Sequence, residues 1–121
     1  MKLLIVDDST MLRDMLVYAL NEGGYKDVTE AVDGKDALNK ALETDFDLII
    51  TDVSMPNMDG IILVGELRKL PQYSKTPILV LTTERSEKIK SQGKESGATG
   101  WIVKPFVPDQ LLKAVNIVLT R

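Results

Sequence analysis

The stretch Leu3-Leu4-Ile5-Val6-Asp7-Asp8 places two carboxylates directly after four consecutive apolar residues. An apolar run without polar alternation is typical of a central strand in a parallel sheet, where both faces are buried. In such sheets, functional groups gather at the carboxyl ends of the strands, near the point where the strand order reverses. The stretch therefore predicts a central parallel strand that ends at a functional site.

Three further apolar runs end on polar residues that could handle a phosphoryl group. They are residues 48–51 before Asp52, residues 78–81 before Thr82, and residues 101–103 before Lys104 and Pro105. A shorter run of mixed polarity, residues 28–32, fits a strand at a sheet edge. Because the carboxyl ends of parallel strands lie along one edge of the sheet, we expect these polar side chains to meet in one crevice.

Helix-like segments alternate with these runs. Ser9 can cap the first helix, Gly23 can end it, and Pro108 suits the first turn of the last helix. The segment 85–96 is predicted to be a polar helix. The other helices carry apolar residues at helical spacing that we expect to be buried: Met11, Leu12, Met15, Leu16, Ala19 and Leu20 in the first; Ala37, Leu38, Ala41 and Leu42 over about 35–44; Ile61, Ile62, Val64 and Leu67 before about residue 69; and Leu111, Leu112, Val115, Val118 and Leu119 in the last.

Five strand–helix units fill the 121 residues, so we expect one domain over residues 1–121 and no output domain. Right-handed crossovers cover both faces of such a sheet with helices. Of the two common doubly wound strand orders, this chain length suits the five-stranded one, 2-1-3-4-5. The predicted fold class is therefore α/β, a flavodoxin-like (βα)5 doubly wound parallel sheet.

The amino-acid composition excludes several kinds of site and several classes of protein. The chain contains no cysteine, which excludes disulfides and thiolate metal sites, and no histidine, so any phosphohistidine must come from a partner. No apolar run approaches the roughly 20 residues of a membrane span. The acidic residues Asp7 and Asp8 come too early for a signal peptide. We therefore expect a cytoplasmic protein that does not engage a membrane.

Charge is unevenly distributed along the chain. Residues 1–84 hold 8 Lys and Arg against 15 Asp and Glu, whereas residues 85–121 hold 7 against 3. The simplest interpretation is a set of solvated helix faces. The alternative is an acidic cation pocket in the first part and a basic docking face in the last. Nucleic-acid binding is not expected from a domain of pI about 4.9, because phosphate contacts need a basic surface.

The acidic residues at the predicted strand ends indicate a cation site. Asp7, Asp8 and Asp52 could separately be helix caps or loop residues. Together on adjacent central strands, however, such close carboxylates are costly unless a cation is present. Oxygen ligands with room for water suit Mg²⁺, and the backbone carbonyl of Ser54 could add one more ligand.

The same residues indicate phosphoryl chemistry. Asp52 is the best candidate nucleophile, because an aspartyl carboxylate can accept a phosphoryl group covalently. Lys104 could pair with a phosphoryl oxygen as a fixed point charge, and its bond to Pro105 is a candidate for the cis form. Thr82 could donate a hydrogen bond to phosphate. Taken singly, Lys104 could also be an ordinary exposed lysine, and Thr82 an ordinary β-branched strand residue.

The full set of motifs resembles a two-component response-regulator receiver domain over the whole chain. The resemblance rests on Asp7-Asp8, on Asp52 with Met55-Pro56 and Asp59-Gly60, on Thr82, and on Lys104-Pro105. The stretch 97–106 is especially similar to CheY chemotaxis proteins, whose strand order is also 2-1-3-4-5.

This resemblance implies a mechanism and a set of partners. Asp52 would take phosphate from a histidine kinase similar to CheA, with Mg²⁺, and Thr82 would then move toward it. Trp101 stands where the family usually has Tyr or Phe and would change rotamer, although edge-strand packing is the simpler interpretation of this residue. The change would reshape the face built from the fourth helix, fifth strand and fifth helix. That face would bind the flagellar motor switch protein FliM.

Further details of the expected regulator also come from the resemblance. The positions of Ser54 and Glu84 tune the phosphoryl lifetime in this family, and a phosphatase is a further partner that the resemblance allows. We expect a monomer. The protein would be a signalling switch, and it would catalyse only its own phosphorylation and dephosphorylation.

Two alternatives remain open at this point. The protein could be a phosphate sink or a phosphorelay intermediate that binds no motor protein. It could also be a phosphatase of the haloacid-dehalogenase type, but those enzymes place an acid two positions after the nucleophile, where this chain has Ser54. A flavin site is less favoured, because the acidic loop after the first strand would repel the phosphate of FMN.

Overall fold

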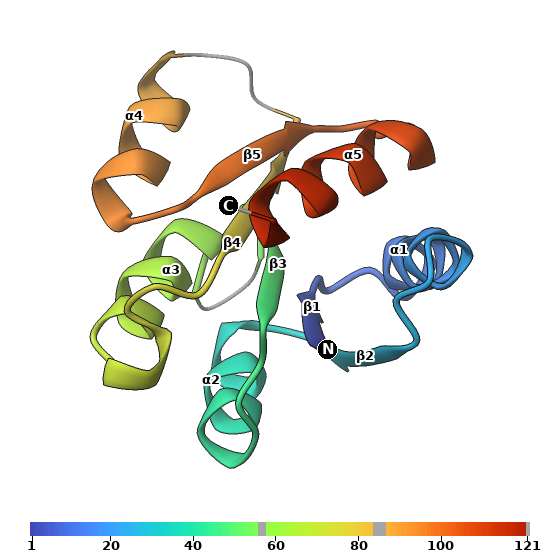
Figure 1. The fold of residues 1–121 in the computed structure, drawn as a ribbon. Coiled ribbons are helices and arrows are strands. Elements are labelled where there is room, and N and C mark those ends of the chain that lie inside the picture. Colours follow the sequence, from blue (N-terminus) through green and yellow to red (C-terminus); the bar gives the residue numbers. More distant parts are fainter. Residues whose placement is uncertain (56–57, 84–86, 121) are drawn as a thin grey trace.

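The computed structural model describes residues 1–55, 58–83 and 87–120, with the backbone alone for residues 87–90 and 93. Strands and helices alternate along the chain (Figure 1). The strands are β1 (Lys2–Val6), β2 (Asp27–Ala31), β3 (Leu48–Asp52), β4 (Ile78–Thr82) and β5 (Gly100–Val103). The helices are α1 (Thr10–Glu22), α2 (Gly34–Glu43), α3 (Gly60–Arg68), α4 (Glu87–Ser96) and α5 (Pro108–Leu119), with a short 3-10 turn at Pro71–Tyr73.

The strands form one five-stranded parallel sheet in the order β2-β1-β3-β4-β5. The predicted fold class and strand order are therefore confirmed. β3 is buried along its whole length, as its apolar sequence indicated. β2, which mixes polar and apolar residues, lies at one edge of the sheet, and β5 lies at the other.

The helices cover the two faces of the sheet in two layers. Leu3 and Ile5 of β1 point into the core shared with α1 and α5, whereas Leu4 and Val6 point into the core shared with α2 and α3. Figure 1 shows α1 and α5 on one side of the strands and α2, α3 and α4 on the other. Within the described residues, none of the helices is long and apolar enough to span a membrane.

Side-chain caps begin three of the helices at the carboxyl edge of the sheet. Ser9 Oγ accepts the Leu12 N–H at 3.2 Å and so caps α1. Asp33 caps α2 in the same way, and Asp59 caps α3 by accepting the Ile62 N–H at 2.8 Å. A cap satisfies an N–H group that the first turn of a helix would otherwise leave without a partner. Each cap therefore fixes where the chain leaves the strand end and where the loop that carries the site turns.

Some apolar residues that we expected to be buried are exposed. Met11 is 73% exposed, Met15 is 48% exposed, Leu42 is 62% exposed and Ile62 is 53% exposed. In α1 the buried residues are Leu16, Ala19 and Leu20, while Met11 and Met15 line a surface hollow together with Tyr18, Phe106 and Pro108. The apolar arc of α1 is wider than the strip that the sheet and α5 cover, so one side of it stays in contact with solvent.

Candidate functional site

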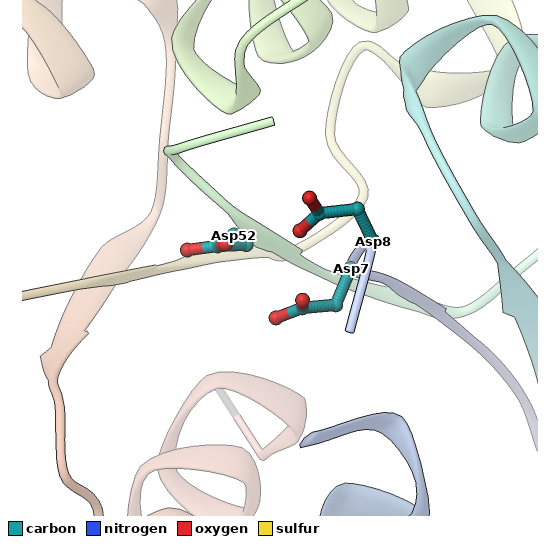
Figure 2. A group of neighbouring side chains, drawn as sticks. All are labelled: Asp7, Asp8 and Asp52. Atoms are coloured by element: carbon teal, nitrogen blue, oxygen red, sulfur yellow. The ribbon is translucent and has the colours of Figure 1, made fainter. Parts of the chain in front are cut away.

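The polar residues that follow the strands meet at the carboxyl edge of the sheet. Asp7 directly follows β1, Asp52 ends β3, Thr82 ends β4, and Lys104 directly follows β5. Asp7, Asp8 and Asp52 each offer a carboxylate oxygen, and these oxygens all lie within 4.8 Å of one another (Figure 2). The predicted crevice therefore contains the three acidic residues that the sequence singled out.

Two of these carboxylates are buried. Asp7 is 1% exposed and Asp52 is 4% exposed, while Asp8 faces solvent. Asp7 Oδ1 accepts the Ser9 N–H at 2.8 Å, but Asp7 Oδ2 has no hydrogen-bond partner among the described residues. Burial raises the pKa of the Asp7 carboxyl, and the charge of Asp52 adds to this rise, although the Ser9 N–H opposes it.

This arrangement suits a hard divalent cation. A buried carboxylate oxygen without a donor is costly unless something positive lies beside it. An all-oxygen cluster with one exposed carboxylate leaves room for water ligands, which Mg²⁺ usually retains. The donor set therefore fits Mg²⁺ better than a metal that prefers nitrogen or sulfur ligands.

Lys104 brings a positive charge to the carboxylate cluster. Its Nζ lies 2.8 Å from Asp52 Oδ1 and 3.7 Å from Asp7 Oδ2, and its side chain is 18% exposed. The Lys104 N–H donates to the Thr82 carbonyl at 2.8 Å, which ties the strand end of β5 to that of β4. The Lys104–Pro105 bond is cis, as the sequence suggested. Lys104 is therefore placed to pair with an anion that arrives at Asp52.

The chain around Asp52 is closely packed against the start of α3. The Val53 N–H donates to the Leu81 carbonyl at 3.0 Å, and the Gly60 N–H donates to the Val53 carbonyl at 2.9 Å. A Cβ added at Gly60 would collide with the carbonyl oxygen of Asp52 itself. Only glycine leaves room for this approach, so the Asp59-Gly60 motif holds the backbone that carries Asp52.

Gly60→Ala is expected to lower the free energy of unfolding by about 1–3 kcal/mol, because the added methyl group must displace backbone rather than a flexible side chain. Gly65→Ala is the matched control in the same helix, since its Cβ would meet none of the described atoms within 4 Å. This control should raise stability by about 0.5–1 kcal/mol through helix propensity. Urea unfolding of both variants measures the difference, and equal midpoints would contradict the packing argument.

The remaining predicted residues lie around this centre. Thr82 is buried, and Trp101 is half-buried and packs against the core on the α2 and α3 side. Trp101 lies opposite Val80 in the β4–β5 register, and Val80 is two residues before Thr82, so Thr82 and Trp101 point to the same face of the sheet. Ser54 is exposed in the segment after β3, and Glu84 lies outside the described residues.

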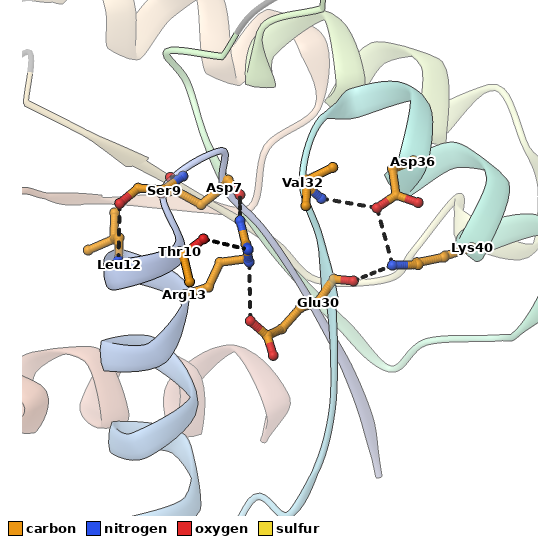
Figure 3. A network of polar contacts seen from close by, with 9 residues as sticks. All are labelled: Asp7, Ser9, Thr10, Leu12, Arg13, Glu30, Val32, Asp36 and Lys40. Atoms are coloured by element: carbon orange, nitrogen blue, oxygen red, sulfur yellow. Dashed lines mark hydrogen bonds and ion pairs between the residues drawn. The ribbon is translucent and has the colours of Figure 1, made fainter.

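The structure adds Arg13, which the sequence analysis did not identify. Its Nη1 donates to the Asp7 backbone carbonyl at 2.6 Å, and its Nε pairs with Glu30 Oε1 at 3.1 Å (Figure 3). Arg13 lies on α1 and Glu30 on β2, separated by 17 residues. A single arginine in an amphipathic helix gives no sequence signal, because its partner is distant along the chain.

Comparisons with known proteins agree with these observations. The family described as "Response regulator receiver domain" matches residues 3–116. Chemotaxis protein CheY1 of Helicobacter pylori is 38% identical over 120 residues, which are 98% of this chain and 97% of that protein. Transcriptional regulatory protein ResD of Bacillus subtilis is also 38% identical, but the match covers 48% of it. The solved structure of Vibrio cholerae CheY4 is 51% identical, with a TM-score of 0.93 over 98% of each chain.

Proposed function

The chain belongs to the response regulator receiver domain family, and from this premise we propose that it is a stand-alone response regulator whose Asp52 accepts a phosphoryl group. The observation that carries the proposal is the buried Asp52 carboxylate, which pairs with Lys104 at 2.8 Å and lies beside Asp7 Oδ2, an oxygen with no hydrogen-bond donor within the described residues. By similarity to the family, the donor is a phosphohistidine on a kinase similar to CheA. That histidine belongs to the partner, because this chain contains no histidine.

The transfer step needs one nucleophile and charge stabilisation. A carboxylate oxygen of Asp52 attacks the phosphorus, an O–P bond forms, and the N–P bond of the phosphohistidine breaks. The leaving imidazole keeps the electron pair of that bond and takes up a proton. Lys104 pairs with a phosphoryl oxygen as negative charge develops on the group. The protein is thus a switch that catalyses only its own phosphorylation and dephosphorylation.

The metal in this proposal is Mg²⁺. Asp7, Asp8 and Asp52 would hold it together with the backbone carbonyl of Ser54 and with water. When bound, it supplies positive charge that stabilises the transferring group. The carboxylate cluster supports this assignment, because three acidic oxygens within 4.8 Å of one another repel each other until a cation joins them.

The output of the proposed switch passes through Thr82 and Trp101. Both side chains lie on the sheet face next to α3 and α4, so a shift of Thr82 toward the phosphoryl group leaves space that Trp101 can use. The responding surface is then α4, β5 and α5, within the basic stretch 85–121. Such a surface favours an acidic partner segment.

We assign the partner by similarity to chemotaxis proteins. CheY1 of Helicobacter pylori and CheY4 of Vibrio cholerae match this chain over nearly its whole length. The proposed partner is therefore the flagellar motor switch protein FliM, bound by a cytoplasmic, monomeric protein with a single domain over residues 1–121. A phosphatase that resets the switch is part of the same proposal.

The test is binding of an N-terminal FliM peptide with and without beryllofluoride and Mg²⁺. Trp101 is the only tryptophan, so its fluorescence reports on one known position, and calorimetry gives the affinity independently. We expect roughly tenfold tighter binding in the activated protein, which is a typical coupling between two sites. A fluorescence response without peptide binding would instead favour the phosphate sink or relay. No response to beryllofluoride would contradict the receiver mechanism itself.

A further inference from the structure

The Arg13 side chain donates three hydrogen bonds next to the loop that carries Asp7 and Asp8. Its Nη1 donates to the Asp7 carbonyl at 2.6 Å, its Nε to Glu30 at 3.1 Å, and its Nη2 to Thr10 Oγ1 at 3.2 Å. The Arg13 side chain is only 11% exposed. The planar fork of a guanidinium can make several bonds in one fixed geometry, so these bonds restrain the position of the loop.

The Arg13 contacts extend into a wider polar network (Figure 3). Glu30 lies opposite Ile5 in the β1–β2 register, so the Arg13–Glu30 pair joins α1 to β2 across the turn after β1. The Glu30 carbonyl in turn accepts the Lys40 ammonium, which also pairs with Asp36 at 3.1 Å. Asp36 accepts the Val32 N–H at 3.0 Å. Lys40 therefore contacts the backbone of Glu30, the residue whose carboxylate pairs with Arg13.

These contacts restrain the Asp7 backbone and one oxygen of the Asp7 carboxylate. Arg13 holds the Asp7 carbonyl on one side, and the Ser9 N–H holds Oδ1 on the other. The remaining oxygen, Oδ2, has no hydrogen bond from the part of the chain that the structure describes, and it lies on the side of the cluster with Asp52 and Lys104. We propose that Arg13 is a positioning residue of the Mg²⁺ site, which sets metal affinity by fixing the orientation of Asp7.

This role is geometric rather than a matter of charge. Glu30 neutralises the guanidinium, so the pair adds little net positive charge to the carboxylate cluster. A lysine at position 13 would keep the charge but could not bond the Asp7 carbonyl, Glu30 and Thr10 in the same fork geometry. Loss of a residue that orients a metal ligand typically weakens metal binding by 10–100-fold.

The inference rests on the proposed Mg²⁺ site, so its test measures Mg²⁺ affinity directly by calorimetry on the unphosphorylated protein. Arg13→Gln and Arg13→Lys should both raise the Mg²⁺ dissociation constant by roughly tenfold. Thr10→Val, which removes the hydroxyl that accepts Arg13 Nη2 without changing the charge near the site, should raise it by a smaller factor. This third variant also tests the inference if Arg13→Gln does not fold.

Arg68→Gln is the matched control. Arg68 also donates to backbone carbonyls, of Gly97, Tyr73 and Thr76, but it lies at the end of α3 away from the carboxyl edge. Its loss should lower the thermal unfolding midpoint without changing the Mg²⁺ dissociation constant. The control therefore separates general destabilisation from loss of ligand orientation.

Several results would overturn the inference. Wild-type affinity in Arg13→Gln, with a lower unfolding midpoint, would make Arg13 a purely structural residue. Wild-type affinity in Arg13→Lys alone would show that charge, and not fork geometry, is what the site needs. If the wild-type protein itself bound no Mg²⁺, the metal site of the proposed function would fail first, and the role of Arg13 would fail with it.

Discussion

Asp52→Asn is expected to abolish phosphoryl uptake from acetyl phosphate in the presence of Mg²⁺. The amide has nearly the same size as the carboxylate, so it should leave the packing of β3 against β4 in place. It is not a competent nucleophile, and it replaces the anion that pairs with Lys104 at 2.8 Å. Uptake should therefore fall to the background level, and mass spectrometry or radiolabelled phosphate measures it.

Asp59→Asn is the control for this experiment. Asp59 also lies between β3 and α3, but its side chain caps α3 by accepting the Ile62 N–H at 2.8 Å. Asparagine caps a helix about as well as aspartate, so this variant should fold and take up phosphate at close to the wild-type rate. If Asp52→Asn reached the wild-type rate and stoichiometry, the proposed mechanism would be wrong.

The same chemistry distinguishes a switch from a phosphatase. An enzyme that turns over phosphate esters through an aspartyl intermediate needs an acid for the leaving group, and position 54 offers only a serine hydroxyl. Ser54 is exposed, and the Lys104 ammonium at the site is paired with Asp52. We therefore expect a single phosphorylation of Asp52 and no multiple turnover on a generic phosphate ester.

The strands and the residues that follow them could be predicted from the sequence with little ambiguity. Unbroken apolar runs such as residues 78–81 are long enough for a strand and too short for a helix. The parallel arrangement then brings Asp7, Asp52 and Lys104 to one edge, whatever the details of the loops. The site was predictable because the backbone topology alone places its residues.

The burial of apolar residues on the outer sides of the helices could not be predicted in the same way. Helical spacing marks Met11 and Met15 as apolar positions, but their burial depends on how far the neighbouring layer extends, and both are exposed. Arg13 was missed for a related reason, because its role depends on Glu30 of β2 and on a backbone carbonyl. Contacts between distant segments leave no local pattern in the sequence.

Asp7→Asn is expected to have two opposite effects, one on metal binding and one on stability. Replacing a carboxylate ligand should weaken Mg²⁺ binding by at least tenfold, since the amide oxygen lacks the charge that this hard cation favours. The metal-free protein should become more stable by about 1 kcal/mol. Asparagine can still accept the Ser9 N–H, but it removes the charge that burial and Asp52 disfavour.

The sign of the stability change follows from the raised pKa of Asp7. The folded protein binds the Asp7 proton more tightly than the unfolded chain does, so Asp7 makes the metal-free stability decline as pH rises through its folded-state pKa. Asp7→Asn removes this titrating group, so the stability of the metal-free protein should decline less as the pH rises. Urea unfolding in EDTA at several pH values measures the effect on stability, and Mg²⁺ calorimetry measures the effect on metal binding.

Asp27→Asn provides the matched control, because it removes one exposed carboxylate at the start of β2, far from the carboxyl edge. It should change neither the Mg²⁺ affinity nor the stability by more than about 0.5 kcal/mol. If Asp7→Asn destabilised the metal-free protein, the pairing of Asp7 with Lys104 at 3.7 Å would outweigh the repulsion among the carboxylates. The cluster would then be an ion-pair network that stabilises the fold. A cation site should instead make the metal-free protein more stable when one of its negative charges is removed.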